Sequence, residues 1–180
     1  TILHIESEAG NAERVRFIVR EFARKNLLGK LANQMETALI SAAYYGHTEV
    51  VEVLIDGAKH LTTSANPVTS FQTFLRQADQ DLETALNVAV GRGHTAIAKL
   101  LVEADPSDTH VQNKDGKTPL YNVAEKGYNK IVMAICKTCA TPSLDGPGGS
   151  TALHAAIGNI HKGMYHKVCL EIFKKLASLS

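Results

Sequence analysis

The amino-acid sequence predicts an all-α solenoid of about five helix-turn-helix repeats joined by hairpin loops. Three observations support this fold class. A pattern of threonine, a small residue and leucine recurs along the chain; a glycine follows most of these threonines by nine residues; and the threonines lie 36, 47, 34 and 33 residues apart. One such unit cannot bury its apolar surface alone, so neighbouring units must stack into one continuous core.

The composition agrees with short helices that pack closely together. Apolar residues make up 44% of the 180 residues, tryptophan is absent and aromatic residues amount to 6%, so the core must consist mainly of Leu, Ile, Val and Ala. The net charge of +1, without a long basic run, argues against broad binding to nucleic acid. Three cysteines do not indicate a disulfide framework, which favours a reducing compartment. We see neither a membrane-spanning apolar run nor a signal peptide.

The leading threonines divide a single domain, residues 1–180, into its units. Well-formed units begin at Thr37, Thr84 and Thr118, a degraded unit begins at Thr1, and a divergent one contains Thr151. We expect unit boundaries at about residues 1–32, 33–79, 80–112, 113–146 and 147–180.

Each well-formed unit carries signals for the start and the end of its first helix. The threonine hydroxyl can cap the free N–H groups at the helix start, and Pro119 suits the first helical position of its unit. Gly46, Gly93 and Gly127 lie where the first helix should end in a left-handed turn, a conformation that glycine adopts without strain.

The hairpins before the units differ in their turn residues. Asp115-Gly116 is a turn signal for the hairpin before Thr118. At the matching positions of the two preceding hairpins the sequence has Met35 and Leu82 instead of glycine. Because a bulky side chain disfavours the left-handed conformation, we expect these two hairpins to be altered.

The longest spacing indicates an insertion at about residues 60–79. Insertions in repeat arrays usually form loops, often on the binding face. The insertion contains Phe71 and Phe74. These two side chains either form a candidate patch for a partner or fold back against the stack.

The last unit ends in a longer amphipathic segment. Met164, Val168, Ile172 and Leu176 share one face at helical spacing, and Tyr165, Cys169 and Phe173 widen it. A terminal repeat needs a polar outer side, so we expect a C-terminal cap. A partner-binding helix is the alternative.

At the repeat positions the chain resembles the ankyrin-repeat family, whose units are about 33 residues long. This resemblance implies an ankyrin-repeat solenoid that binds a protein partner on a concave surface. Hairpin tips and the exposed ends of the first helices form that surface in the family.

A finer resemblance covers residues 83–157. It rests on Glu103-Ala104-Asp105-Pro106, on Gly116-Lys117-Thr118-Pro119-Leu120-Tyr121, and on residues 146–156, which read GPGGSTALHAA. This wording is similar to the plant ankyrin-repeat membrane proteins of the accelerated-cell-death type, although Asn122, Val123 and Ser150 depart from it. The resemblance implies a cytoplasmic-side domain of a defence or stress-signalling protein. That parent protein would be anchored in the plasma membrane by helices absent from this chain.

No group of residues predicts catalysis, a cofactor, a metal ion or a small-molecule substrate, so we expect a binding protein and not an enzyme. The histidines at positions 4, 47, 94 and 154 lie at ankyrin signature positions, where the resemblance implies hydrogen bonds between repeats. Cys136 and Cys139 form a C-x-x-C pair that could be a redox pair or half of a zinc site. A second cysteine pair is missing, which favours a packing role.

Register within the repeats predicts where a protein partner would bind. The exposed residues just before each turn include Tyr44, Tyr45, Arg92, Glu125 and Lys126. Tyr and Arg are enriched at binding hot spots, so the first three are the leading candidates. The two tyrosines could instead cover the neighbouring hairpin.

Three kinds of function fit such a stack. The leading interpretation is a protein-interaction scaffold of the plant type described above. The alternatives are a structural or gating domain of a membrane channel or transporter, and a soluble regulatory ankyrin adaptor.

Overall fold

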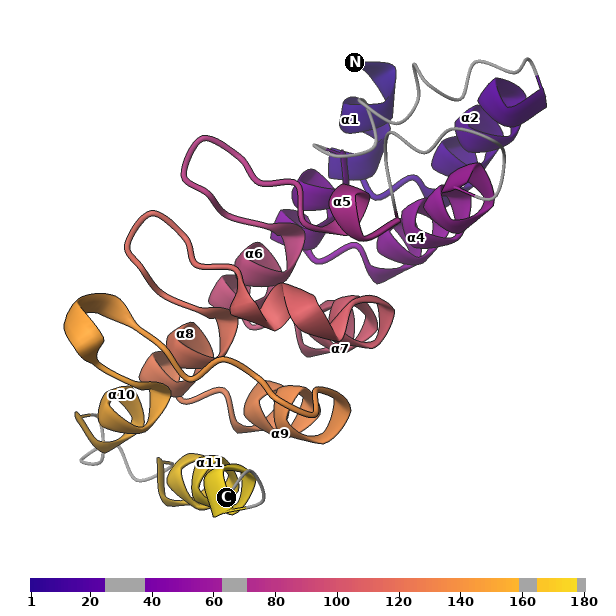
Figure 1. Cartoon of the computed structure of the whole chain (residues 1–180). Helices are drawn as coiled ribbons and strands as arrows, with labels where there is room; N and C mark the ends of the chain where they lie inside the picture. The colour runs from indigo at the N-terminus through magenta and orange to yellow at the C-terminus, as the bar shows by residue number, and fades with distance from the viewer. Residues whose placement is uncertain (25–37, 63–70, 159–164, 178–180) are drawn as a thin grey trace.

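The structure is a computed structural model that describes residues 1–24, 38–62, 71–158 and 165–177. Its helices form two rows, and hairpins project side by side from one of them (Figure 1). The hairpin row holds the first helices: α1 (Ile2–Glu8), a helix at residues 38–45, α6 (Ala85–Arg92), α8 (Pro119–Lys126) and α10 (Ala152–Gly158). The other row holds α2 (Ala12–Arg24), α4 (Thr48–Thr62), α7 (Thr95–Ala104), α9 (Asn129–Thr138) and α11 (Tyr165–Ala177).

Short helical turns occupy some of the connections between units. They are α5 (Phe71–Leu75), η1 (Pro106–His110) and η2 (Pro147–Gly149). Within the described residues the β-structure consists of two isolated bridges, each at the base of a hairpin. The prediction of an all-α solenoid of stacked helix pairs is therefore confirmed.

The first helices begin and end as the sequence predicts. The hydroxyl of Thr84 accepts a hydrogen bond from the Asn87 N–H at 3.3 Å, and Pro119 is the first residue of α8. The glycines after three first helices adopt left-handed φ angles of 83°, 80° and 74° (Gly46, Gly93 and Gly127). Gly46 has a second reason to lack a side chain, because a Cβ there would lie 2.7 Å from the His94 ring. Thr37 lies outside the described residues.

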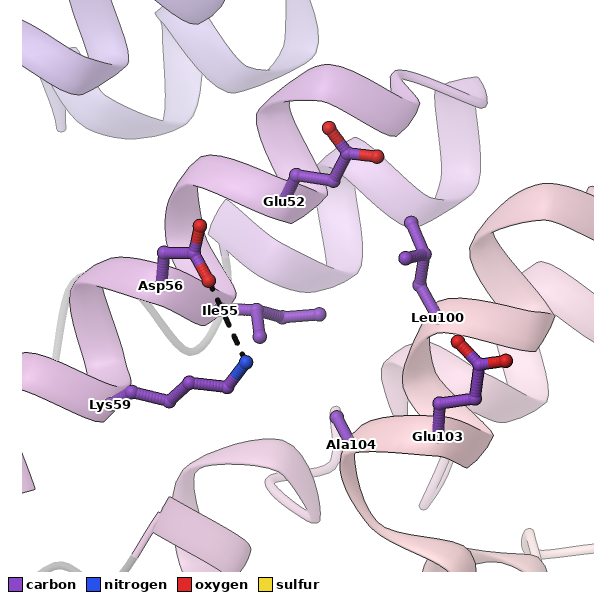
Figure 2. Close-up of a pocket in the computed structure, with 7 residues that line it drawn as sticks. All are labelled: Glu52, Ile55, Asp56, Lys59, Leu100, Glu103 and Ala104. Carbon is purple, nitrogen blue, oxygen red and sulfur yellow. Dashed lines mark ion pairs between the residues drawn. The ribbon is translucent and has the colours of Figure 1, made fainter. Parts of the chain in front are cut away.

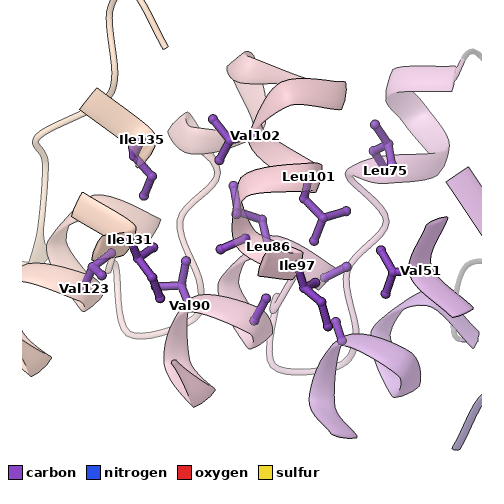
Figure 3. Packing of buried hydrophobic residues seen from close by; sticks show 14 of the residues in the cluster. Val51, Leu75, Leu86, Val90, Ile97, Leu101, Val102, Val123, Ile131 and Ile135 are labelled. Atoms are coloured by element: carbon purple, nitrogen blue, oxygen red, sulfur yellow. The ribbon is translucent and has the colours of Figure 1, made fainter. Parts of the chain in front are cut away.

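The core runs through the whole stack between the two rows. Four leucines of the repeated pattern are almost completely buried (Leu3, Leu39, Leu86 and Leu120), and Leu153 of the last unit is partly buried. Side chains of the second helices, such as Ile97 and Ile131, pack against Leu86, Val90 and Val123 of the first helices (Figure 3). Ala42 and Ala89 are also fully buried, and their small size lets neighbouring helices approach closely.

The hairpin around Leu82 is not altered, so that prediction is wrong. Leu82 has a φ of 57° and takes the left-handed conformation that Gly116 takes, at 72°, in the next hairpin. The Asp79 N–H donates to the Glu83 carbonyl at 3.2 Å, and the Leu82 N–H donates to the Asp79 carbonyl at 3.1 Å. The same two bonds recur around Gly116. Met35, the other substituted position, lies outside the described residues.

Side-chain and inter-hairpin bonds explain why Leu82 tolerates this conformation. The Asp79 carboxylate accepts from the backbone N–H groups of Asp81 and Glu83 at 2.8 and 3.0 Å. The Lys114 N–H of the next hairpin donates to the Asp81 carbonyl at 3.0 Å. These bonds outweigh a strain of roughly 1–2 kcal/mol for a left-handed non-glycine residue.

The insertion at residues 60–79 is not simply a loop. Its first residues continue α4 through Thr62, and residues 71–75 form α5. Helix α5 precedes its hairpin at the position that η1 occupies in the next unit. Residues 63–70 lie outside the described part of the chain.

The buried face of the last helix is narrower than the sequence predicts. Val168 and Ile172 of α11 are buried, but Phe173 is 59% exposed and Leu170 is 46% exposed. Phe173 lies one residue beyond Ile172, about 100° around the helix, so it points away from α9. Met164 lies outside the described residues. Among the described helices, none has both the length and the apolar character needed to cross a membrane.

Candidate protein-binding surface

Three of the predicted partner-binding residues lie together on the surface. Tyr44 lies in the last turn of the helix at residues 38–45, and Arg92 ends α6 of the next unit. The Arg92 guanidinium carbon lies 3.6 Å from the centre of the Tyr44 ring, a cation–π contact. The rings of Tyr44 and Tyr45 meet edge to face at 5.0 Å. Because 42% of Tyr44 and 48% of Tyr45 is exposed, both rings remain accessible.

A fourth residue, Glu8 of the preceding unit, contacts this group of side chains. The Tyr45 hydroxyl donates a 2.6 Å hydrogen bond to the Glu8 carboxylate, which also raises the pKa of Tyr45. The Tyr45 ring also stacks on the His47 ring, with 6.2 Å between the two ring centres. The register placed Glu8 at an exposed position, but the sequence carried no signal of its bond to Tyr45. We call Glu8, Tyr45, Tyr44 and Arg92 the aromatic row; it crosses three adjacent units.

Hydrogen bonds from histidine rings to backbone carbonyls of the preceding unit fix the helix ends that carry the aromatic row. The His47 ring bonds to the Glu8 carbonyl at 2.9 Å, and the His94 ring bonds to the Tyr44 carbonyl at 3.2 Å. These two histidines therefore link repeats, as the resemblance implied. Among the described residues, the rings of His4 and His154 bond instead to the threonine three residues earlier in their own unit.

Lys126 takes the role of the missing histidine in the fourth unit. Tyr128 occupies the histidine position there, and the Lys126 ammonium donates instead to the Gly91 carbonyl at 2.7 Å. Glu125 accepts a 2.7 Å bond from Lys117. Both predicted partner residues lie beyond Arg92 along the stack and are held by contacts within it.

Phe71 and Phe74 do not form a surface patch. Phe74 is only 6% exposed, and Phe71 is partly buried against the core with the Lys59 ammonium 5.9 Å from its ring centre. Leu75, the last residue of α5, is also buried, so α5 packs against the core at this junction. Of the two alternatives, the described part of the insertion at residues 71–79 folds back against the stack.

The two cysteines of the C-x-x-C pair are also buried in the stack. Cys136 is 8% exposed and Cys139 is 3% exposed. The Cys139 thiol donates to the Pro106 carbonyl at 3.4 Å, and burial raises the pKa of Cys136 to about 11. A neutral buried thiol is a poor nucleophile and a poor metal ligand. No cluster of His, Cys, Asp or Glu in the described ranges has the arrangement of a metal site.

Sequence reasoning missed a buried charged cluster where α5 meets η1. Arg76, directly after α5, donates two hydrogen bonds to the Asp105 carboxylate. Asp108 is 1% exposed, and burial, reinforced by the charge of Asp105, raises its pKa to about 7. The Thr84 hydroxyl donates to one Asp108 oxygen at 3.3 Å, while the other oxygen lacks a partner among the described residues. This cluster joins the second and third units.

Comparison with known proteins identifies the family to which this stack belongs. A model of three ankyrin repeats matches residues 86–178, more than half of the chain, and a model of one ankyrin repeat matches residues 35–64. No curated protein matches the chain. Ankyrin repeats generally mediate protein–protein interaction, and the proteins that contain them are typically interaction modules and not enzymes. The chain belongs to the ankyrin-repeat family.

Proposed function

We propose that this chain is a scaffold that binds a protein partner through the aromatic row. The supporting observation is the ordered contact of Tyr44, Tyr45 and Arg92 on adjacent units, with both tyrosine rings still exposed. Tyr and Arg are the residues most enriched at binding hot spots. Because their contacts already restrict the side chains, little conformational entropy remains to be lost on binding.

The charges of the aromatic row define the chemistry of the partner surface. Its two ends carry opposite charges, a carboxylate at Glu8 and a guanidinium at Arg92, with two aromatic rings between them. A complementary surface would place an acidic group near Arg92 and an apolar side chain over the rings. Glu125 and Lys126 would lie at the edge of such an interface.

The finer assignment is a cytoplasmic-side domain of a plasma-membrane protein in plant defence or stress signalling. It is supported by the wording of residues 103–106, 116–121 and 146–156, set out above. Expressing the parent open reading frame and separating the cell fractions would test it. The parent protein should sediment with plasma membrane, whereas recovery in the soluble fraction would exclude this assignment and leave the scaffold role intact.

Affinity capture tests the scaffold role. Wild-type chain, Tyr44→Ala and Arg92→Ala are immobilised, and bound proteins are quantified by mass spectrometry. A partner of the aromatic row should bind each variant at least about tenfold more weakly, the loss typical of a hot spot. Lys130→Ala on α9 is the control, because Lys130 is exposed and lies on the second-helix row. Equal capture by all four proteins would refute the role of the aromatic row.

A further inference from the structure

A groove lies between the second helices α4 and α7, in the row of helices opposite the hairpins (Figure 2). Its volume is about 270 Å³. Side chains one helical turn apart line each wall: Glu52, Ile55, Asp56 and Lys59 from α4, and Leu100, Glu103 and Ala104 from α7. Helices α4 and α7 contact each other less than α7 and α9 do, which leaves room for the groove.

The floor of the groove is apolar and its rim is acidic. Ile55 is 5% exposed, and Leu100 and Ala104 are partly buried, so they offer a short aliphatic surface. Figure 2 shows Ile55 and Leu100 pointing toward each other across the gap. The carboxylates of Glu52 and Glu103 come from opposite walls of the groove, Glu52 from α4 and Glu103 from α7.

The carboxylates of the rim are only weakly neutralised. Lys59 lies 3.6 Å from Asp56, and Lys99 lies 3.7 Å from Glu103; both pairs join neighbouring turns of one helix at exposed positions. Exposed pairs of this kind contribute about 0.2–1 kcal/mol and exchange partners readily. Within the described part of the chain, no cation pairs with Glu52.

We propose that this groove binds an arginine side chain presented by a protein partner. The aliphatic part of the arginine would lie against Ile55, Leu100 and Ala104, and its guanidinium group would pair with the carboxylates of the rim. A planar guanidinium has five N–H donors and can serve two carboxylates at once, whereas a lysine ammonium is more strongly hydrated. The acidic rim disfavours a phosphate-bearing ligand. The proposal is independent of the aromatic row, which lies on the first-helix row.

Nuclear magnetic resonance with a short peptide tests this proposal. The ¹⁵N-labelled full chain is titrated with acetyl-Gly-Ala-Arg-Ala-Gly-amide, and peptides with glutamine or lysine in place of arginine are the comparisons. We expect chemical-shift changes at amides of α4 and α7, at least about tenfold weaker binding of the glutamine peptide, and about threefold weaker binding of the lysine peptide. Raising the salt concentration should weaken binding of the arginine peptide.

Matched protein variants locate the binding site. Glu52→Gln and Glu103→Gln should each weaken binding about three- to fivefold, in line with exposed ion pairs. Glu13→Gln is the control, because it removes the same charge from an exposed position on α2. All three changes are conservative and at the surface, and far-UV circular dichroism verifies that each variant is folded.

Four results of the peptide titrations would overturn the proposal. They are equal binding of the arginine and glutamine peptides, equal binding of the arginine and lysine peptides, equal affinity of Glu13→Gln and the two groove variants, and shifts confined to the first-helix row. Concentration-dependent shifts of the same α4 and α7 amides without peptide would also overturn it, because a second copy of the chain would then occupy the groove.

Discussion

The segments that follow the second helices of the second and third units occupy the same position but have opposite chemistry. Helix α5 buries Phe74 and Leu75; 34 residues later, η1 buries Asp108 and Thr109. The apolar pair contributes burial of hydrophobic surface. The polar pair depends on hydrogen bonds, such as the 2.8 Å bond from the Thr109 hydroxyl to the Pro106 carbonyl, and keeps one buried carboxylate oxygen unsatisfied.

The position of a segment in the stack, and not the type of its residues, therefore determines whether its side chains are buried. Each segment packs against the second helix that precedes it, and Arg76, directly after α5, bonds to Asp105 just before η1. The insertion therefore serves as part of the core at one junction, while a polar network does so at the next. The two junctions should respond differently to truncation and to pH.

The largest expected effect is at the apolar junction. Phe74→Ala should lower the free energy of unfolding by about 3–4 kcal/mol, because it removes a buried aromatic ring and leaves a cavity. Urea denaturation followed by circular dichroism measures this change. Phe71→Ala, at a partly exposed ring, should cost clearly less. Equal losses for the two variants would mean that α5 is not docked through Phe74.

The polar junction should make stability depend on pH. The pKa of Asp108 is raised from 3.8 to about 7, so the folded state binds this proton more tightly than the unfolded chain. The resulting stabilisation is fully present below about pH 4 and is lost as the pH rises to about 7, with a total on the order of 4 kcal/mol. Asp108→Asn should therefore be more stable than wild type at pH 8 and nearly equal at pH 4. Urea titrations at both pH values measure this, and a constant difference between the two proteins would contradict it.

Substitutions in the two hairpins that Lys114 connects should change the free energy of unfolding by a smaller amount, in opposite directions. Leu82→Gly should stabilise the chain by about 1 kcal/mol, because the relief of left-handed strain exceeds the entropic cost of glycine. Gly116→Ala should destabilise it by a similar amount. The nearest atom to a Cβ at Gly116 is 3.6 Å away, so strain and not collision is the cause. Thermal unfolding gives both values, and changes of the same sign would show that the two hairpins are not equivalent.

Local rules of the repeat made much of the fold predictable. Threonine caps, glycine turns and the buried leucines depend on residues close in sequence, and the register alone brought Tyr44 and Arg92 to neighbouring exposed positions. Exceptions to the rules could not be predicted, because contacts between units determine them. The turn at Leu82 is held by a bond from the Lys114 N–H to the Asp81 carbonyl, and the Lys126 ammonium replaces a histidine ring by reaching the Gly91 carbonyl of the previous unit. The burial of Phe74 required knowing which way α5 folds.

The most direct test of the central claim, that the aromatic row contacts a protein partner, is site-specific photocrosslinking. Benzoylphenylalanine replaces Tyr44 in one protein and Met133 in another; both native side chains are partly exposed, but Met133 lies on α9 in the second-helix row. Each protein is mixed with the partner recovered by affinity capture and irradiated. The account predicts a crosslinked complex from position 44 and little from position 133. Crosslinking from position 133 without any from position 44 would contradict it.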